Sequence, residues 1–180
     1  MPRNVEIKAR VRQPDRLLDA VLDLADKGPT LFAQDDTFFA CPNGRLKLRT
    51  FSETEGQLIF YRRDDREGPK LSEFVVARTQ EPDALRAALT LAYGATGRVK
   101  KTRTLCLIGQ TRVHLDEVEG LGHFVELEVV LTAQQTVDEG QAIAEDLMKR
   151  LGIGPESLVT HAYVDLLARK KQAGLDDEPD

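Results

Sequence analysis

With 180 residues, the chain is long enough to fold as one domain with a substantial hydrophobic core. Its formal net charge of -5 argues against a nonspecific nucleic-acid-binding protein, whose surface is basic. Two cysteines without metal-ligand spacing are too few for a disulfide scaffold, and no apolar run approaches the roughly 18 residues of a membrane span. The N-terminus has no hydrophobic signal core, so we expect a cytoplasmic protein that contacts neither nucleic acid nor membrane.

The N-terminal half predicts one helix among five strands. Residues 4–12 alternate between apolar and polar side chains, which is the period of a strand. Leucine and valine residues at helical spacing predict a helix over 14–27, which Gly28 and Pro29 end. Further strands are predicted at 35–40, 45–51, 57–63 and 72–79, with a polar loop over 64–70.

The C-terminal half predicts three more helices and three more strands. A helix over 81–93 precedes strands at 98–107, 111–118 and 123–131. Thr136 and Glu139 have capping-box spacing and predict a helix that ends at Leu151, and a last helix is predicted over 155–171. We place the domain at 1–172 and expect the acidic segment 173–180 to be disordered. The predicted fold class is α+β, and eight antiparallel strands suffice to close a β-barrel with helices packed outside.

Charged side chains share one face of several predicted strands. In the first strand that face carries Asn4, Glu6, Lys8, Arg10 and Arg12, opposite Val5, Ile7, Ala9 and Val11. Two arrangements give this pattern. In an open sheet the charged face is solvated and acids pair with bases across strands. In a closed barrel the charges point inward, where a ligand of opposite charge offsets the cost of burying them. The spacing alone leaves both arrangements open.

The charged faces contain more bases than acids. The bases are Lys8, Lys47, Arg49, Arg63, Lys101, Arg103 and Arg112, and the acids are Glu6, Asp116, Glu126 and Glu128. Arginine forks match phosphate oxygens, and carboxylates suit a hard cation such as Mg²⁺ or Mn²⁺. In a barrel, this combination fits a triphosphate bound with a divalent ion.

Several sequence blocks carry a resemblance to a known family. They are Glu6-x-Lys8, Gly44 to Arg49, Leu58 to Arg63, Gly68 to Ser72, Val99 to Arg103, Arg112 to Asp116 and Gly120 to Glu128. In this order they resemble the CYTH superfamily, the triphosphate tunnel metalloenzymes, and most of all its class IV adenylyl cyclase-like branch. The resemblance implies an eight-stranded antiparallel barrel around a charged tunnel.

The resemblance also implies roles for the charged residues. The seven bases would bind the triphosphate, and Glu6, Asp116, Glu126 and Glu128 would coordinate Mg²⁺ or Mn²⁺. The catalytic residues it points to are Lys8, Arg63 and Asp116. His114 shares the tunnel-facing parity, and we expect it to pair with a carboxylate.

The family signature is usually Glu-x-Glu-x-Lys, whereas this chain has Asn4 at the first acidic position. An amide oxygen can ligate a cation but carries no charge, so a second metal site would be weakened. Three functions remain open: a cyclase acting on ATP, a phosphohydrolase acting on tripolyphosphate or thiamine triphosphate, and a noncatalytic triphosphate-binding module. The sequence leaves formation of a homodimer open as well.

Overall fold

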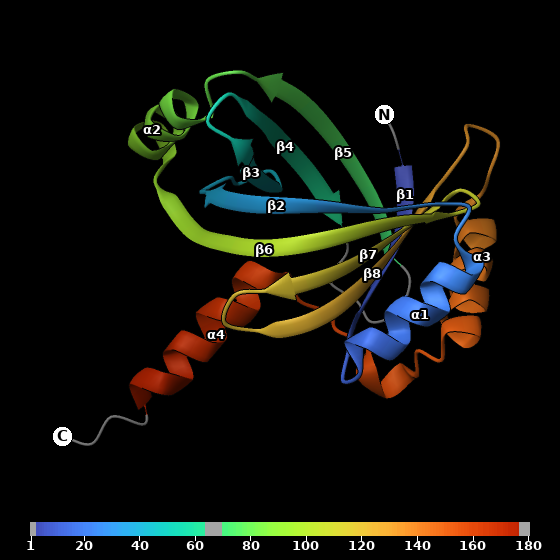
Figure 1. Ribbon diagram of the computed structural model, residues 1–180. Coiled ribbons are helices and arrows are strands. Elements are labelled where there is room, and N and C mark those ends of the chain that lie inside the picture. Colours follow the sequence, from blue (N-terminus) through green and yellow to red (C-terminus); the bar gives the residue numbers. More distant parts are fainter. Residues whose placement is uncertain (1–2, 64–69, 177–180) are drawn as a thin grey trace.

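The chain forms a closed antiparallel barrel of eight strands, in the order β1-β5-β4-β3-β2-β6-β7-β8 (Figure 1). The computed structural model describes residues 3–63 and 70–176. The strands are β1 (Arg3–Arg10), β2 (Lys27–Phe39), β3 (Arg45–Ser52), β4 (Glu55–Arg63), β5 (Lys70–Thr79), β6 (Ala95–Ile108), β7 (Thr111–Val118) and β8 (Gly122–Val130). The predicted fold class, an antiparallel barrel with helices outside it, is confirmed.

The helices lie outside the barrel (Figure 1). They are α1 (Pro14–Leu24), α2 (Pro82–Tyr93), α3 (Val137–Leu151), the short 3-10 helix η1 (Pro155–Ser157) and α4 (Tyr163–Asp176). The capping box predicted for α3 is present, because Thr136 accepts from the Glu139 amide while the Glu139 carboxylate accepts from the Thr136 amide. None of the helices among the described residues is long and apolar enough to cross a membrane.

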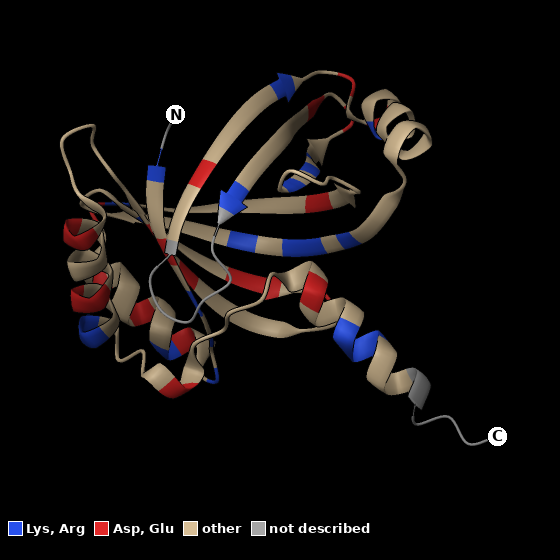
Figure 2. Cartoon of the chain, turned by 180° about the vertical axis from the view of Figure 1, so that it is seen from behind, with Lys and Arg blue, Asp and Glu red and all other residues tan. Residues whose placement is uncertain are grey.

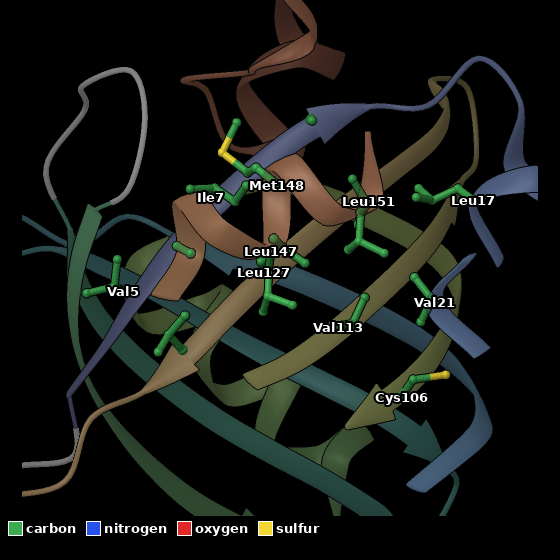
Figure 3. Close-up of a cluster of buried hydrophobic side chains, with 14 of the residues drawn as sticks. Val5, Ile7, Leu17, Val21, Cys106, Val113, Leu127, Leu147, Met148 and Leu151 are labelled. Atoms are coloured by element: carbon green, nitrogen blue, oxygen red, sulfur yellow. The ribbon is translucent and has the colours of Figure 1, made fainter. Parts of the chain in front are cut away.

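The main hydrophobic core lies between the outside of the barrel and helices α1 and α3 (Figure 3). The apolar face of β1, with Val5 and Ile7 nearly inaccessible, packs there against Leu147 and Leu151 of α3. Helix α3 approaches β1 closely at Gly140, where a Cβ would lie 2.8 Å from Val5 Cγ2. Because successive side chains of a strand alternate between faces, this outward apolar face sends the charged face of β1 into the barrel.

A second core cluster closes one end of the barrel. Ala162, Tyr163 and Val164, at the start of α4, pack against Phe38 of β2 and Phe124 of β8. The Phe124 and Tyr163 rings meet edge to face, with centroids 4.9 Å apart. The chain just before α4 is held as well, since the Val159 amide donates to the Lys8 carbonyl over 2.8 Å.

The predicted helix over 155–171 is wrong in its first half. Only Pro155–Ser157 form a 3-10 turn, and the chain is then extended until α4 begins at Tyr163. A β-bridge joins Leu158 to Ala9, so pairing with β1 overrides the local helical pattern. Helix α4 continues to Asp176, so the first four residues of the predicted disordered tail, 173–176, are helical.

Two other boundaries differ from the prediction. The first helix ends at Leu24, and β2 begins at Lys27. Gly28 and Pro29 therefore lie inside a strand, at a register irregularity between Lys27 and Thr30 where β2 pairs with β6. The predicted loop over 64–70 lies mostly outside the described residues.

Candidate functional site

The interior of the barrel holds a cavity of about 490 Å³ that side chains from all eight strands line. Charged positions recur along the strands that enclose it (Figure 2). The predicted site residues at its wall are Glu6, Lys8, Lys47, Arg49, Lys101, Arg103, Arg112, Glu126 and Glu128. Of the two arrangements that the alternation allowed, the structure therefore shows the closed barrel with its charges pointing inward, and not the open sheet with a solvated face. Arg63 ends β4, and its side chain lies outside the described part of the chain.

The lining is more nearly balanced in charge than the sequence suggested. Among the described residues at the cavity wall, six cations (Lys8, Lys47, Arg49, Lys101, Arg103, Arg112) face five carboxylates (Glu6, Asp36, Glu55, Glu126, Glu128). Their distribution is uneven. Four of the cations project from β3 and β6, whereas three of the acids project from the paired strands β1 and β8. The cavity thus has a basic wall and an acidic wall.

Asp36 is the anchor of the basic wall, and the sequence reasoning missed it. Its carboxylate is 2% exposed and accepts from Lys47 Nζ, Arg49 Nε and Arg49 Nη2, each over 2.8 Å. Burial opposes ionisation, but the charges of Arg49 and Lys47 outweigh it and hold the pKa of Asp36 well below its usual value. Strand parity could have identified Asp36 as a site residue. In the predicted strand 35–40, Asp36 and Phe38 share the face that points into the barrel.

The two lysines of the basic wall have lowered pKa values although each is paired with a carboxylate. Burial, and then the neighbouring Arg49, lower the pKa of Lys47 to about 8. Burial and the neighbouring Arg103 likewise lower the pKa of Lys101 well below its usual value. Burial therefore destabilises the charged form of each lysine, and an anion placed between these side chains would stabilise that form.

Asp116 lies behind the cavity wall rather than at its surface. Arg103 donates to its carboxylate oxygens through Nε and Nη2, each over 2.6 Å, and the Tyr163 hydroxyl donates to it over 2.8 Å. Lys101 Nζ is 3.4 Å away. Both oxygens are thus engaged at a site that is 2% exposed, which does not match the metal-binding or catalytic role predicted for this residue.

Tyr163 is a second contributor that the sequence reasoning missed. Its ring lies against two tunnel cations, with the Lys8 ammonium 4.0 Å and the Lys101 ammonium 4.9 Å from the ring centroid. It sits at the start of α4, inside the range 155–171 over which the sequence predicted a helix. Its position follows from the extended segment before α4, which only the tertiary structure reveals.

The acidic wall centres on Glu126 and Glu128. Glu126 lies 3.6 Å from Lys8 Nζ and 3.8 Å from Arg103 Nη2. Glu128 accepts from Asn4 Nδ2 and lies 3.0 Å from His114 Nε2, so His114 pairs with a carboxylate as expected. Burial opposes ionisation of Glu126, but Lys8 and Arg103 hold its pKa well below the usual value.

Glu6 and Asn4 complete the acidic wall. Glu6 stands directly opposite Glu128 in the β1–β8 pair, and Glu128 also meets Arg112 Nη1 over 3.4 Å. Asn4 is 1% exposed, and within the described residues its Oδ1 atom has no hydrogen-bond partner. That oxygen can accept from a donor or ligate a cation at this wall.

Among residues 3–63 and 70–176, no three His, Cys, Asp or Glu side chains form a group that could hold a metal ion by themselves. Magnesium commonly binds through one or two carboxylates and completes its shell with water and substrate phosphate. The acidic wall fits a metal of that kind, whose remaining ligands come from the substrate, and does not fit a resident metal held by protein alone.

Comparison with known proteins agrees with the barrel. The CYTH domain matches residues 2–163. An Aeromonas hydrophila protein named adenylate cyclase CyaB is 26% identical over 171 residues, which cover 88% of this chain and 85% of the relative.

Solved structures share the fold. A Pyrococcus horikoshii protein superposes with a TM-score of 0.78 at 24% identity, over 91% of this chain and 98% of that one. A Hippeastrum protein described as having a dominant triphosphatase activity superposes with a TM-score of 0.63 at 18% identity, over 94% and 96% of the two chains. Since the domain match spans nearly the whole sequence and the barrel agrees with it, the chain belongs to the CYTH domain family.

Proposed function

We propose that this protein is a divalent-metal-dependent enzyme that acts on a triphosphate bound inside the barrel. The observation that carries the proposal is the division of the cavity into a basic wall, centred on Lys47, Arg49, Lys101 and Arg103, and an acidic wall on β1 and β8. A metal–triphosphate complex has the complementary division, because its phosphate oxygens are negative and its metal is positive.

Glu6, Glu126 and Glu128 would hold the metal, which we propose to be Mg²⁺ or Mn²⁺, together with phosphate oxygens. When bound, such an ion acts as a Lewis acid on the phosphoryl group. Asp116 is better explained as a positioning residue, since it fixes the Arg103 fork through two hydrogen bonds. Arg103 would then meet the phosphate in a preset orientation, which lowers the ordering cost of binding.

The basic wall supplies the electrostatic part of catalysis. Lys47, Arg49, Lys101 and Arg103 would neutralise the charge that develops on the phosphate oxygens as the bond to the leaving group breaks. Lys8 projects from β1 beside the acids, 3.6 Å from Glu126 and 4.0 Å from the centroid of the Tyr163 ring. We propose Lys8 and Arg63 as the further catalytic cations.

Two reactions use this arrangement. In the cyclase reaction the 3′-hydroxyl oxygen of ATP bonds to the α-phosphorus, the bond to the bridging oxygen breaks, and pyrophosphate leaves while the hydroxyl proton is released. In the hydrolase reaction a water oxygen bonds to a terminal phosphorus, the bond to the bridging oxygen breaks, and orthophosphate and the shortened phosphate chain leave while a proton is released. The Aeromonas relative supports the cyclase, which we favour, and the Hippeastrum structure supports the triphosphatase as the second candidate.

The deciding experiment incubates the purified protein with ATP, tripolyphosphate or thiamine triphosphate, each with Mg²⁺ or Mn²⁺, and identifies the products by mass and chromatography. Cyclic AMP with pyrophosphate establishes the cyclase. Orthophosphate without cyclic AMP establishes the phosphohydrolase. Binding without any product would identify a noncatalytic binding module, with Asn4 in the acidic wall as the first cause to examine.

Arg49→Ala tests the location of the site. We expect calorimetry to show loss of triphosphate binding, with the circular dichroism spectrum unchanged. The matched control is Arg98→Ala, because Arg98 pairs with Asp35 through the same two-pronged contact but is 52% exposed. Wild-type affinity in Arg49→Ala would remove the barrel interior as the binding site.

A further inference from the structure

Beside its charged walls, the cavity has an apolar stretch. Phe32 of β2 and Phe51 of β3 line it, with ring centroids 6.4 Å apart and planes inclined by 61°, and Leu105 of β6 adjoins them at the wall. Within the described residues neither ring belongs to the two buried core clusters, which lie outside the barrel and at its α4 end. A pair of half-buried aromatic rings facing a cavity offers a surface on which a planar group can stack.

Gln34 lies between this aromatic pair and the basic wall. It follows Phe32 on the inward face of β2, opposite Lys101 in the pairing with β6. The side chain is 7% exposed, and its Oε1 atom has no hydrogen-bond partner among the described residues. A primary amide offers a donor and an acceptor side by side, so the Oε1 atom can accept from a ligand while the amide nitrogen beside it donates.

The spacing along the strands fits a nucleotide. Phe51 is the next inward residue after Arg49 on β3, and Gln34 is the next inward residue before Asp36 on β2. Same-face neighbours in a strand lie about 7 Å apart. That separation leaves room for a sugar between a phosphate held by Arg49 and a base held by Phe51 and Gln34.

We propose that Phe32, Gln34 and Phe51 form a subsite for the base of a nucleoside triphosphate, with adenine as the base that fits best. One ring stacks face-on against the heterocycle and the other, inclined by 61°, meets it edge-on, while the Gln34 amide pairs with its N6 and N7 edge, the contact that glutamine characteristically makes with adenine. The inference rests on the proposed triphosphate function and deepens it, since inorganic tripolyphosphate would use the charged walls alone. The cavity, at about 490 Å³, lies within the usual size of small-molecule sites, about 300–1,000 Å³.

The test compares two ligands in one set of variants. Calorimetry measures the affinities of wild type, Phe51→Ala and Gln34→Leu for the Ca²⁺ complexes of ATP and of tripolyphosphate. Loss of one stacking or amide contact should weaken ATP binding at least fivefold, the lower end of the range for such contacts. Tripolyphosphate binding should change less than twofold, and its retention also shows that each variant is folded.

Two controls sharpen the comparison. Tyr93→Ala removes an aromatic ring that is 59% exposed on α2 and should leave both affinities unchanged. Phe51→Leu keeps the apolar packing while removing the aromatic face, so it replaces Phe51→Ala if that variant does not fold.

Equal losses for ATP and tripolyphosphate, or no loss for either, would overturn the base subsite while leaving the triphosphate function intact. If wild type binds neither ATP nor tripolyphosphate, the proposed function itself is refuted, and the subsite with it.

Discussion

Replacing Asp36 by asparagine tests whether the basic wall is a dry, electrostatically coupled site. The substitution keeps the shape of the side chain but removes the charge that Lys47 and Arg49 share through three hydrogen bonds of 2.8 Å. Breaking a buried ion pair from one side costs about 3–5 kcal/mol, because the remaining charges stay buried without compensation. Asp36 is 2% exposed, so this range applies with little reduction for solvent screening.

The assay is urea denaturation of wild type, Asp36→Asn and the matched control Asp35→Asn. Asp35 is the adjacent residue on β2, and its partner Arg98 is 52% exposed, so the control should lose no more than about 1 kcal/mol. Tripolyphosphate at a hundred times its dissociation constant should restore about 2.7 kcal/mol to Asp36→Asn by mass action. A loss in Asp36→Asn as small as that of the control would mean that water already screens the basic wall, and the wall would then not be an electrostatically coupled site.

Four further results are expected. Triphosphate affinity should fall about tenfold between pH 7 and pH 9, because burial, and then Arg49, lower the pKa of Lys47 to about 8 and the neutral amine no longer attracts phosphate. In Lys47→Arg, whose side chain stays charged, the affinity should depend less on pH. The same depressed pKa means that the unfolded chain binds more protons than the folded one between about pH 8 and 10.5, so this group makes stability rise with pH there, as urea midpoints can check. Chelation with EDTA should stop turnover but leave the melting temperature unchanged, because no metal group formed by protein alone exists among the described residues, and a drop in melting temperature would reveal a structural ion. Gly140→Ala should lower the free energy of unfolding by about 1–3 kcal/mol, since the new methyl group would lie 2.6 Å from Leu131 Cδ2 and push α3 away from β1. The control is Gly109→Ala, where a Cβ meets nothing within 4 Å, so that this variant tests the effect of a positive φ alone.

Much of the site could be predicted because strand parity is local information. Once residues 4–10 form a strand, Glu6 and Lys8 must share a face, and the same holds for Lys47 with Arg49 and for Glu126 with Glu128. The structure places all of these side chains at one cavity. The capping box of α3 is local in the same way, since both of its hydrogen bonds join residues three apart.

The parts that could not be predicted depend on contacts between distant segments. Asp36 becomes part of the basic wall because β2 pairs with β3, which sets it opposite Arg49. Tyr163 reaches Lys8 because the segment before α4 is extended and hydrogen-bonded to β1, against its helical pattern. Asp116 shows the converse: its parity suggested a tunnel ligand, but Arg103 and Tyr163 occupy both oxygens behind the wall.

Which side chains share a face follows from local sequence, because the two-residue period of a strand does not depend on the neighbouring strands. Closure of the barrel determines whether that face is solvated or enclosed, and it results from the pairing of β1 with β5 on one side and with β8 on the other. Closure gathers the charges of eight strands around one cavity, where burial shifts the pKa values of several of them, and the strand order sets the basic wall of β3 and β6 apart from the acidic wall of β1 and β8. The alternation is the same in an open sheet, so only the tertiary structure could make this surface a binding site.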